Sequence, residues 1–370
     1  MSKAAELAAL IGSGQAQGDK NLIINGAMQV AQRGTSVTGV SGGGYETVDR
    51  FRTAYNGTPD ELRVTHAQVT DAPDGFSNSF KLTVTTPETT LAADERVRFH
   101  QRIEGFNLQQ LAFGTSSALP ITLSFYVKSS IAGTYGVDLK NNSAARQAAQ
   151  SYTISSANTW EKKTLTFAGD TAGAFNNDNS NALNVSWALA AGTDYTSGTL
   201  ATAFEAATNA NTAPSGHVNL IGTDNATWQL AGVQLEIGEV ATPFEHESYA
   251  ETLRKCQRYF YRVGGEIDAS GAYTGGIASG VMYGTTAATT MRPNPVTMRD
   301  APNVTFDDAV ANYTVMTSRT TNAVTAVGDN SSTVSTVRVN LTCGATSNDG
   351  DGAVLRSTRA QSTVSVDAEL

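Results

Sequence analysis

The stretch 228–260 constrains the fold of this chain more than any other. Its first part has apolar residues at the spacing of a buried strand. The pair Thr242-Pro243 then predicts an extended segment, because proline disfavours the helical conformation of the residue before it. Ser248, with Glu251 three residues later, matches a capping box and predicts the start of a helix. One stretch therefore closes a β-rich region and opens a short helix.

The predicted helix carries one narrow apolar stripe. Its members are Tyr249, Leu253, Cys256 and Phe260, at successive spacings of four, three and four residues. These spacings place all four on one helix face, and a single helix cannot bury such a face alone. Because the stripe lies between two β-rich halves, we expect it to be an oligomer interface, where several copies of the chain meet.

Residues 21–245 contain many short strand-like runs separated by turns. In 121–129 apolar and polar residues alternate, which is typical of a half-buried strand. Trp187 and Trp228 fall in alternating strands, so we expect both in the core. The number and order of strands predict an antiparallel jelly-roll β-sandwich.

A second β-rich region follows the helix. Its strand-like runs predict a smaller C-terminal β-sandwich, with pairing interrupted near Pro293, Pro295 and Pro302. The predicted organisation is an N-terminal segment (1–20), a jelly roll (21–245), a linker helix at the oligomer axis (246–262) and a terminal domain (263–370). The fold class is therefore all-β with one short helix between the domains.

The N-terminal segment reads as a short helix followed by a flexible linker. Its apolar residues, Leu7, Leu10 and Ile11, are too few to stabilise an independent helix. We expect this helical segment to pack on another protein and so to act as an anchor.

Composition excludes several classes of partner. Charged residues are only 16% of the chain, and the net charge is −9. Residues 251–370 hold 10 Lys+Arg and 11 Asp+Glu, so of the total 25 and 34 the first 250 residues hold 15 and 23. An acidic body argues against a nucleic-acid partner, which requires a basic face. No run reaches the ~18 apolar residues of a membrane span, so membrane insertion is not expected.

The sequence has no motif that indicates an enzyme or a cofactor. The carboxylates lie outside diagnostic motifs, and the four histidines have no metal-binding spacing. A structural calcium ion would suit the acidic body, but 348–351 lacks the glutamate of a calcium loop and is better explained as a hydrated turn. We therefore predict a protein without catalytic residues and without a required cofactor.

Sugar binding needs flat aromatic faces next to planar polar groups. Aromatic residues in loop-like or strand-end positions are the candidates for glycan binding: Tyr45, Tyr55, Trp160, Tyr273, Tyr283 and Tyr313. Each one alone is better explained by packing or as an ordinary exposed ring. Only a cluster of several rings on one face would favour a binding site.

Four segments carry a specific resemblance: 21–36 (NLIINGAMQVAQRGTS), 48–51 (VDRF), 231–260 (AGVQLEIGEVATPFEHESYAETLRKCQRYF) and 366–370 (VDAEL). In these segments the chain resembles a family of bacteriophage tail-fibre proteins. In that family a jelly roll like those of carbohydrate-binding modules precedes a small trimeric β domain. The resemblance covers 21–262 and the end of the chain, and it is weak across 265–350.

The resemblance implies a virion structural protein, made in the host cytoplasm, that attaches the particle to the host surface. It implies a homotrimer, docked through its N-terminus to a tail adaptor or other virion protein and binding a host surface glycan. The terminal domain, where the resemblance fades, would be the tip that reads the host. Three alternatives remain open: a head-decoration fibre, a carbohydrate-binding adhesin module of a bacterial surface protein, and a polysaccharide depolymerase.

Overall fold

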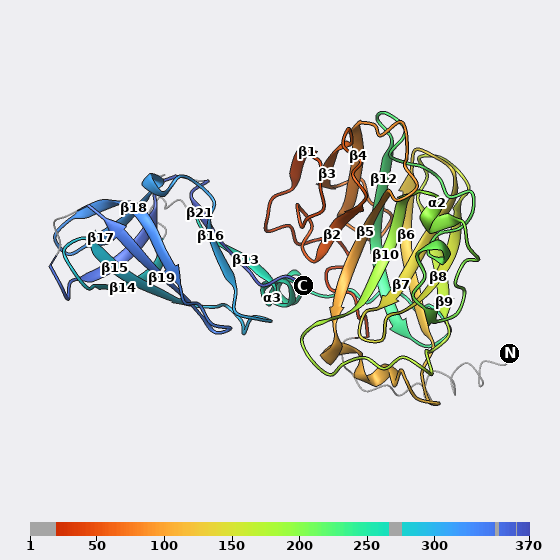
Figure 1. The fold of residues 1–370 in the computed structure, drawn as a ribbon. Coiled ribbons are helices and arrows are strands. Elements are labelled where there is room, and N and C mark those ends of the chain that lie inside the picture. The colour runs from red at the N-terminus through yellow and green to blue at the C-terminus, as the bar shows by residue number, and fades with distance from the viewer. Residues whose placement is uncertain (1–19, 266–275, 345–347, 360) are drawn as a thin grey trace.

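The computed structural model describes residues 20–265, 276–344, 348–359 and 361–370. It confirms the all-β fold class, with two β-rich bodies on either side of a short helix (Figure 1). The predicted N-terminal anchor, with Leu7, Leu10 and Ile11, lies outside the described residues, and so does Tyr273.

The first body is a sandwich of two six-stranded antiparallel sheets. The β12 sheet has the order β1 (Ser36–Val40), β3 (Arg63–Val69), β4 (Ser79–Thr86), β12 (Thr227–Ile237), β6 (Ile121–Ser129) and β9 (Glu161–Phe167). The β10 sheet has the order β11 (Glu205–Ala206), β8 (Arg146–Ile154), β7 (Gly133–Asn141), β10 (Asn181–Ala191), β5 (Arg96–Glu104) and β2 (Phe51–Asn56). Short helical turns η1 (Gly105–Leu111), α2 (Thr193–Thr196) and η2 (Asn209–Asn211) lie in the connections.

Aromatic side chains from both sheets fill the sandwich core. The rings of Phe80 and Phe99, from opposite sheets, stack with centroids 3.9 Å apart. Trp187 and Trp228 are fully buried, as the alternating pattern predicts. In β6 the apolar positions face this core and are buried, so the predicted alternation is confirmed. Burial of such rings supplies most of the stabilisation of a two-sheet fold.

The jelly roll begins and ends side by side. Leu22 N donates to Leu235 O at 2.9 Å, and Lys20 pairs with Glu236 at 3.4 Å. The chain thus leaves the sandwich next to its described start and enters helix α3 (Tyr249–Gln257). The Ser248 side chain accepts a hydrogen bond from Glu251 N, which confirms the predicted helix start.

The second body differs from the expected sandwich. Six strands close into a barrel in the order β14 (Gly276–Met282), β15 (Ala287–Pro293), β19 (Thr336–Cys343), β18 (Thr321–Asn330), β17 (Tyr313–Thr317) and β20 (Gly352–Ser357). A separate three-stranded sheet has the order β13 (Phe260–Gly264), β21 (Thr363–Asp367) and β16 (Asn303–Phe306), and the turn η3 (Val310–Asn312) precedes β17. Closure of the barrel pairs both edge strands of the sheet. A barrel and a sandwich have the same alternation of apolar and polar residues along their strands, so the sequence pattern did not distinguish them. As predicted, pairing stops in the proline-rich segment, because β15 ends at Pro293 and β16 starts at Asn303.

Candidate functional site

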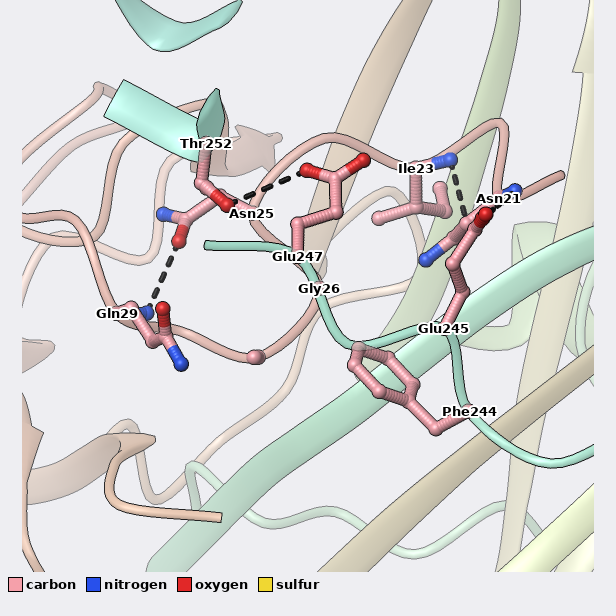
Figure 2. Close-up of a pocket in the computed structure, with 10 residues that line it drawn as sticks. Asn21, Ile23, Asn25, Gly26, Gln29, Phe244, Glu245, Glu247 and Thr252 are labelled. Carbon is pink, nitrogen blue, oxygen red and sulfur yellow. Dashed lines mark hydrogen bonds between the residues drawn. The ribbon is translucent and has the colours of Figure 1, made fainter. Parts of the chain in front are cut away.

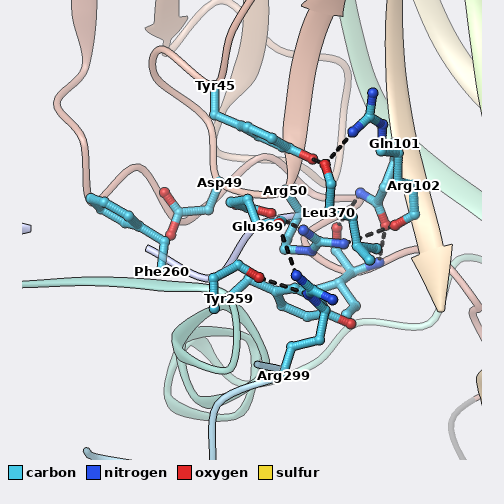
Figure 3. A network of polar contacts seen from close by, with 12 residues as sticks. Tyr45, Asp49, Arg50, Gln101, Arg102, Tyr259, Phe260, Arg299, Glu369 and Leu370 are labelled. Atoms are coloured by element: carbon cyan, nitrogen blue, oxygen red, sulfur yellow. Dashed lines mark hydrogen bonds and ion pairs between the residues drawn. The ribbon is translucent and has the colours of Figure 1, made fainter. Parts of the chain in front are cut away.

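A buried polar junction joins the jelly roll to α3 and to the end of the chain (Figure 3). At its centre is Arg50, which is 1% exposed and pairs with Glu369. The Arg50 guanidinium lies 3.4 Å from the ring centroid of Tyr259 and donates to Arg102 O at 2.8 Å. Burying an arginine is costly unless its charge is paired; here the charge is paired and both terminal nitrogens donate, while Nε has no partner among the described residues.

Two further arginines hold the last residues of the chain. Arg33 pairs with Asp367 at 3.0 Å, and its guanidinium lies 3.5 Å from the ring centroid of Phe260. Arg299 donates to Ala368 O at 2.7 Å and to Glu369 O at 3.1 Å. The terminal segment is thus fixed by side chains from the jelly roll and from the second body.

A third group ties the helix to β5. Arg258 makes a bidentate pair with Glu104, at 3.0 and 2.7 Å, and the Tyr259 hydroxyl donates to the same carboxylate. Glu104 is 1% exposed, so its charge depends on these partners. The hydrogen bonds to the Glu104 carboxylate raise the pKa of Arg258, because the carboxylate stabilises the charged guanidinium.

The resemblance-bearing segments meet at this junction. The side chain of Gln32, in segment 21–36, donates to the carboxylate of Asp49, in segment 48–51. It also donates to Phe260 O, in segment 231–260, at 2.8 Å. Arg50 of the second segment binds Glu369 of the fourth. Segments more than 300 residues apart in sequence are therefore parts of one contact network, and the physical role of these motifs is to lock the two bodies together.

Asp49 is the titratable group at the centre of the junction. Its carboxylate accepts from Gln32 N at 2.9 Å and from the Gln32 side chain. Burial raises the pKa of Asp49 to about 6, although the hydrogen bonds from Gln32 oppose the rise. Cys256 is buried nearby, and burial raises the pKa of its thiol well above the ordinary value, so it is protonated at neutral pH.

The predicted interface stripe divides into two halves. Cys256 and Phe260 are 0% and 3% exposed within a single chain, so neither can face another copy, and the prediction is wrong for both. They are buried because the junction already covers that end of α3. Tyr249 is 56% exposed and Leu253 is half-buried, so only these two remain at the surface.

One predicted glycan-binding residue is buried, and two others are half-buried with their hydroxyl groups engaged or buried within the chain. Tyr313 is fully buried and its hydroxyl donates to Thr363 O, so it cannot stack on a sugar. The Tyr45 hydroxyl donates to Leu370 O at 3.3 Å, and burial raises its pKa to about 12. Tyr55 packs against the sandwich core and its hydroxyl is buried. In each case an aromatic residue in a loop or at a strand end turns inward.

Two predicted residues remain accessible, on different bodies. Tyr283 follows β14 in the barrel and is 53% exposed. Trp160 precedes β9 on the jelly roll and is half-buried. Its indole Nε1 donates to Asp71 at 3.2 Å, and the Lys128 ammonium lies 5.8 Å from its ring centroid.

Trp160 lies beside a group of rings that we did not predict from the sequence. These rings lie on the outer face of the β12 sheet, and we call them the ring cluster: Phe76, Tyr126, Phe244 and His246. The Phe76 ring is at their centre, with centroids 5.6 Å from Tyr126, 4.9 Å from Phe244 and 5.3 Å from His246. Tyr126 alternates with core residues in β6, so the sequence pattern could have indicated that its ring points outward.

A β-bulge makes room for the ring cluster. The pairing of β12 with β6 shifts register between Ala231 and Gln234, and Gly232 inside the shift has φ +58°. A Cβ atom at Gly232 would lie 2.6 Å from the Phe76 ring and 2.9 Å from the Tyr126 ring. Glycine is required here both for the positive φ and for the close approach of the two rings.

Polar groups surround Trp160 at the edge of the ring cluster. Asp71 accepts from Lys128 at 2.6 Å and from Gln229 at 3.1 Å. The hydrogen bond from Lys128 holds the pKa of Asp71 below its ordinary value. Lys128 and Tyr126 are two residues apart on the same face of β6, so the rings and these planar polar groups form one continuous surface.

A shallow hollow lies between the 21–29 segment and residues 244–252 (Figure 2). Phe244 belongs both to its lining and to the ring cluster. Glu245 accepts from Asn21 N at 2.8 Å, and Glu247 accepts from Thr252 and pairs with Lys255. Its carboxylates are thus engaged within the chain, and we assign no ligand to it.

Within the described ranges, no three His, Cys, Asp or Glu side chains come close enough together to hold a metal ion. The 348–351 turn is closed by Asn348 N donating to the Asp351 carboxylate at 3.0 Å, which also pairs with Arg319 at 3.2 Å. No helix in the described part of the chain has the length and hydropathy needed to cross a membrane.

No family model and no curated protein matches the sequence. Several solved structures resemble it at low identity. The enzymatically active domain of tailspike protein 4 of bacteriophage CBA120 is 14% identical, with a TM-score of 0.31, covering 59% of this chain and 21% of that one. This chain therefore spans about a fifth of the tailspike chain.

Two carbohydrate-binding modules are also similar. The family 11 module of the Clostridium thermocellum cellulase Lic26A-Cel5E is 13% identical, with a TM-score of 0.29, covering 55% of this chain and 99% of that one. The module TmCBM61, in complex with β-1,4-galactotriose, is 8% identical, with a TM-score of 0.28 and coverages of 59% and 99%. At these scores we base no functional argument on any of the three.

Proposed function

We propose that this chain is the subunit of a trimeric bacteriophage tail fibre that attaches the particle to a glycan on the host surface. The observation that carries the proposal is the junction. The segments that resemble tail-fibre proteins, 21–36, 48–51, 231–260 and 366–370, all contribute to it, together with Arg102, Glu104 and Arg299. A fibre must transmit load between its domains, and a buried network of ion pairs between them serves that purpose.

The proposed glycan site is the ring cluster together with Trp160. Pyranose C–H faces stack on aromatic rings, and sugar hydroxyls bind planar polar groups. Phe76 and Tyr126 supply rings, while Asp71 and Gln229 supply polar groups beside Trp160. This places glycan binding on the jelly roll, whereas the sequence alone favoured the terminal domain as the tip.

Several copies would make a weak site effective. A contact with a Kd of about 1 mM is worth about 4 kcal/mol. Linked copies raise the overall avidity by about 10² to 10⁴ without a better single site. In this proposal the N-terminal segment docks each trimer to the virion, and the copies of the jelly roll present the ring cluster together.

Labelling of intact particles tests the proposed role. An antibody against the purified chain should decorate phage tails in electron micrographs, and the free protein should block adsorption of the phage to its host. Decoration of heads alone would support a head fibre instead. Labelling of the bacterial surface with no labelling of particles would overturn the proposal.

Sedimentation of the full chain at micromolar concentration tests the trimer. We expect Leu253→Asp to yield monomers, because it places three charges where apolar side chains would meet. The matched control is Val334→Asp, which adds a charge to an exposed apolar position of the barrel and should leave a trimer. A stable monomer of the unmodified chain would rule out the trimer.

A further inference from the structure

The outer face of the β10 sheet concentrates arginines. Arg52 of β2 is the register partner of His100 of β5. Arg98 and Arg102 lie two residues before and after His100, so all three β5 side chains point to the same face. Along a strand two residues span about 7 Å, so the three arginines surround His100 at close range.

Two of these arginines have no carboxylate partner among the residues that the structure describes. Arg98 donates to the Asn56 amide oxygen at 2.9 Å, and Arg52 donates to the Thr53 carbonyl at 3.3 Å. By contrast, the neighbouring Arg96 is paired with Asp138. Positive charge is therefore left uncompensated on this face, although the whole chain has a net charge of −9.

The same face has buried polar atoms without hydrogen-bond partners. His100 is 1% exposed, and in the described part of the chain neither of its ring nitrogens has a partner. The Asn184 Oδ1 and Ser186 Oγ atoms of β10 are also buried and unpaired there. Their register partners in β5 are Arg102 and His100, so they lie on the same outer face. Such buried groups are costly to leave unpaired, so this face favours a ligand or water that satisfies them.

The arginines also raise one another's electrostatic energy. Burial lowers the pKa of Arg98, and the nearby charge of Arg96 lowers it further. Burial lowers the pKa of His100 well below its ordinary value, and Arg98 and Arg102 add to that effect, so the ring is neutral. An anion placed among these groups would relieve the repulsion and accept hydrogen bonds from the guanidinium N–H groups, whereas Asn184 Oδ1 needs a donor such as a sugar hydroxyl.

We propose that this surface, which we name the arginine face (Arg52, Arg98, His100, Arg102, Asn184 and Ser186), binds an anionic saccharide bearing a carboxylate or a phosphate group. The inference rests on the proposed glycan attachment and adds a second, anion-selective site on the sheet opposite to the one that carries the ring cluster. Guanidinium groups bind both anions through paired, charge-assisted hydrogen bonds. The half-buried Arg52 and Arg98 bind the anion, and the sugar lies across β5 and β10.

Three polymers with one backbone test the charge requirement: neutral dextran, carboxymethyl dextran and phosphorylated dextran. The full-length protein should bind at least one of the anionic polymers in 0.15 M salt. Binding should be weaker in 0.5 M salt, because salt screens the attraction between exposed charges. Binding to one anionic polymer and not the other identifies carboxylate or phosphate as the recognised group. Equal binding to neutral dextran would overturn the charge requirement.

Charge-neutralising variants locate the site. Arg52→Gln and Arg98→Gln should each weaken binding about tenfold, the effect of losing one charge-assisted hydrogen bond. Arg338→Gln removes the same charge from the exposed surface of β19 and should leave binding unchanged. Glutamine keeps an N–H donor for the Asn56 amide oxygen and removes one of the charges that repel each other. Arg98→Gln should therefore leave the melting temperature unchanged or raise it. A lower melting temperature with unchanged binding would make Arg98 a structural residue and overturn the proposal.

Two further outcomes separate this inference from the proposed function. Dissociation of the oligomer in the Arg52→Gln/Arg98→Gln variant would identify the arginine face as a contact between copies and overturn the saccharide site. Failure of both anionic dextrans, with host-cell binding preserved, would overturn this inference alone. If the unmodified protein did not bind host cells at all, the proposed attachment function would be overturned instead.

Discussion

The junction and the ring cluster use the same kinds of side chain with opposite results. In the junction the guanidinium groups of Arg33 and Arg50 lie 3.5 and 3.4 Å from aromatic centroids, and the Glu369 carboxylate that both pair with is buried. In the ring-cluster surface the ammonium groups of Lys128 and Lys162 lie 5.8 and 5.9 Å from their rings. Both places combine cations with rings, but only the first is closed to water.

Burial explains the difference. Removing one member of a buried pair leaves a charge with neither water nor a partner, which costs several kcal/mol. At a surface, water replaces the lost partner and the cost falls below about 1 kcal/mol. The junction is therefore suited to holding two bodies together, whereas the ring cluster keeps its faces available to a ligand.

The largest expected effect is at Glu369. Glu369→Gln preserves the shape but leaves Arg50 buried without a countercharge, and we expect the free energy of unfolding to fall by about 3 kcal/mol. Urea denaturation measures this change. The control Arg319→Gln breaks a pair with Asp351 in which the arginine side chain is 59% exposed, so it should cost less than about 1 kcal/mol. Equal losses in the two variants would contradict the contrast between buried and exposed pairs.

A smaller, pH-dependent effect is expected at Asp49. Its folded-state pKa of about 6 exceeds the unfolded value of about 3.9, so the folded chain binds this proton more tightly. The resulting stability is fully present below about pH 4 and is lost as pH rises through about 6. Asp49→Asn should therefore raise the melting temperature at pH 7 and leave it unchanged near pH 4.

A matched control for Asp49 is available at Asp308, in the loop between β16 and β17. A hydrogen bond from Ser362 holds the pKa of Asp308 below its ordinary value, so the sign of its effect is reversed. Asp308→Asn should not raise the melting temperature at pH 7. If both variants behaved alike, the stabilisation would not come from the buried carboxylate of the junction.

The smallest effect on stability is expected at Trp160. Because the ring is only half-buried, Trp160→Ala should lower the free energy of unfolding by about 1 kcal/mol. Binding of the full chain to host cells should nevertheless weaken about tenfold, as expected when one stacking ring is lost. Tyr283→Ala removes an exposed ring from the barrel and should leave binding intact. The reverse result would move the glycan site to the terminal domain.

Much of the local structure could be predicted from the sequence. The alternation in 121–129, the burial of Trp187 and Trp228 and the helix start at Ser248 are all confirmed. These features depend on residues within a few positions of one another, because strand and helix periodicities are local. The candidate site was less predictable: of the accessible rings around it, only Trp160 was identified.

Long-range contacts account for what was missed. Cys256 and Phe260 form a helical stripe that suggests an interface, but the end of the same chain and the 32–50 segment cover it. Tyr313 sits where β17 begins and was predicted to be available, but closure of the barrel buries it. Closure depends on strand pairings that a periodic pattern leaves undetermined.

The sequence by itself determined which segments are strands, where the helix begins and which face of each strand is apolar. Only the tertiary structure decided which outward-facing residues become neighbours. Phe76, Tyr126 and Phe244 belong to distant segments and meet because a bulge at Gly232 bends β12 against β6. Arg52 and Arg98 similarly share a face through the pairing of β2 with β5. Local periodicity fixes the direction of a side chain, but only the register of strands distant in sequence fixes what it meets.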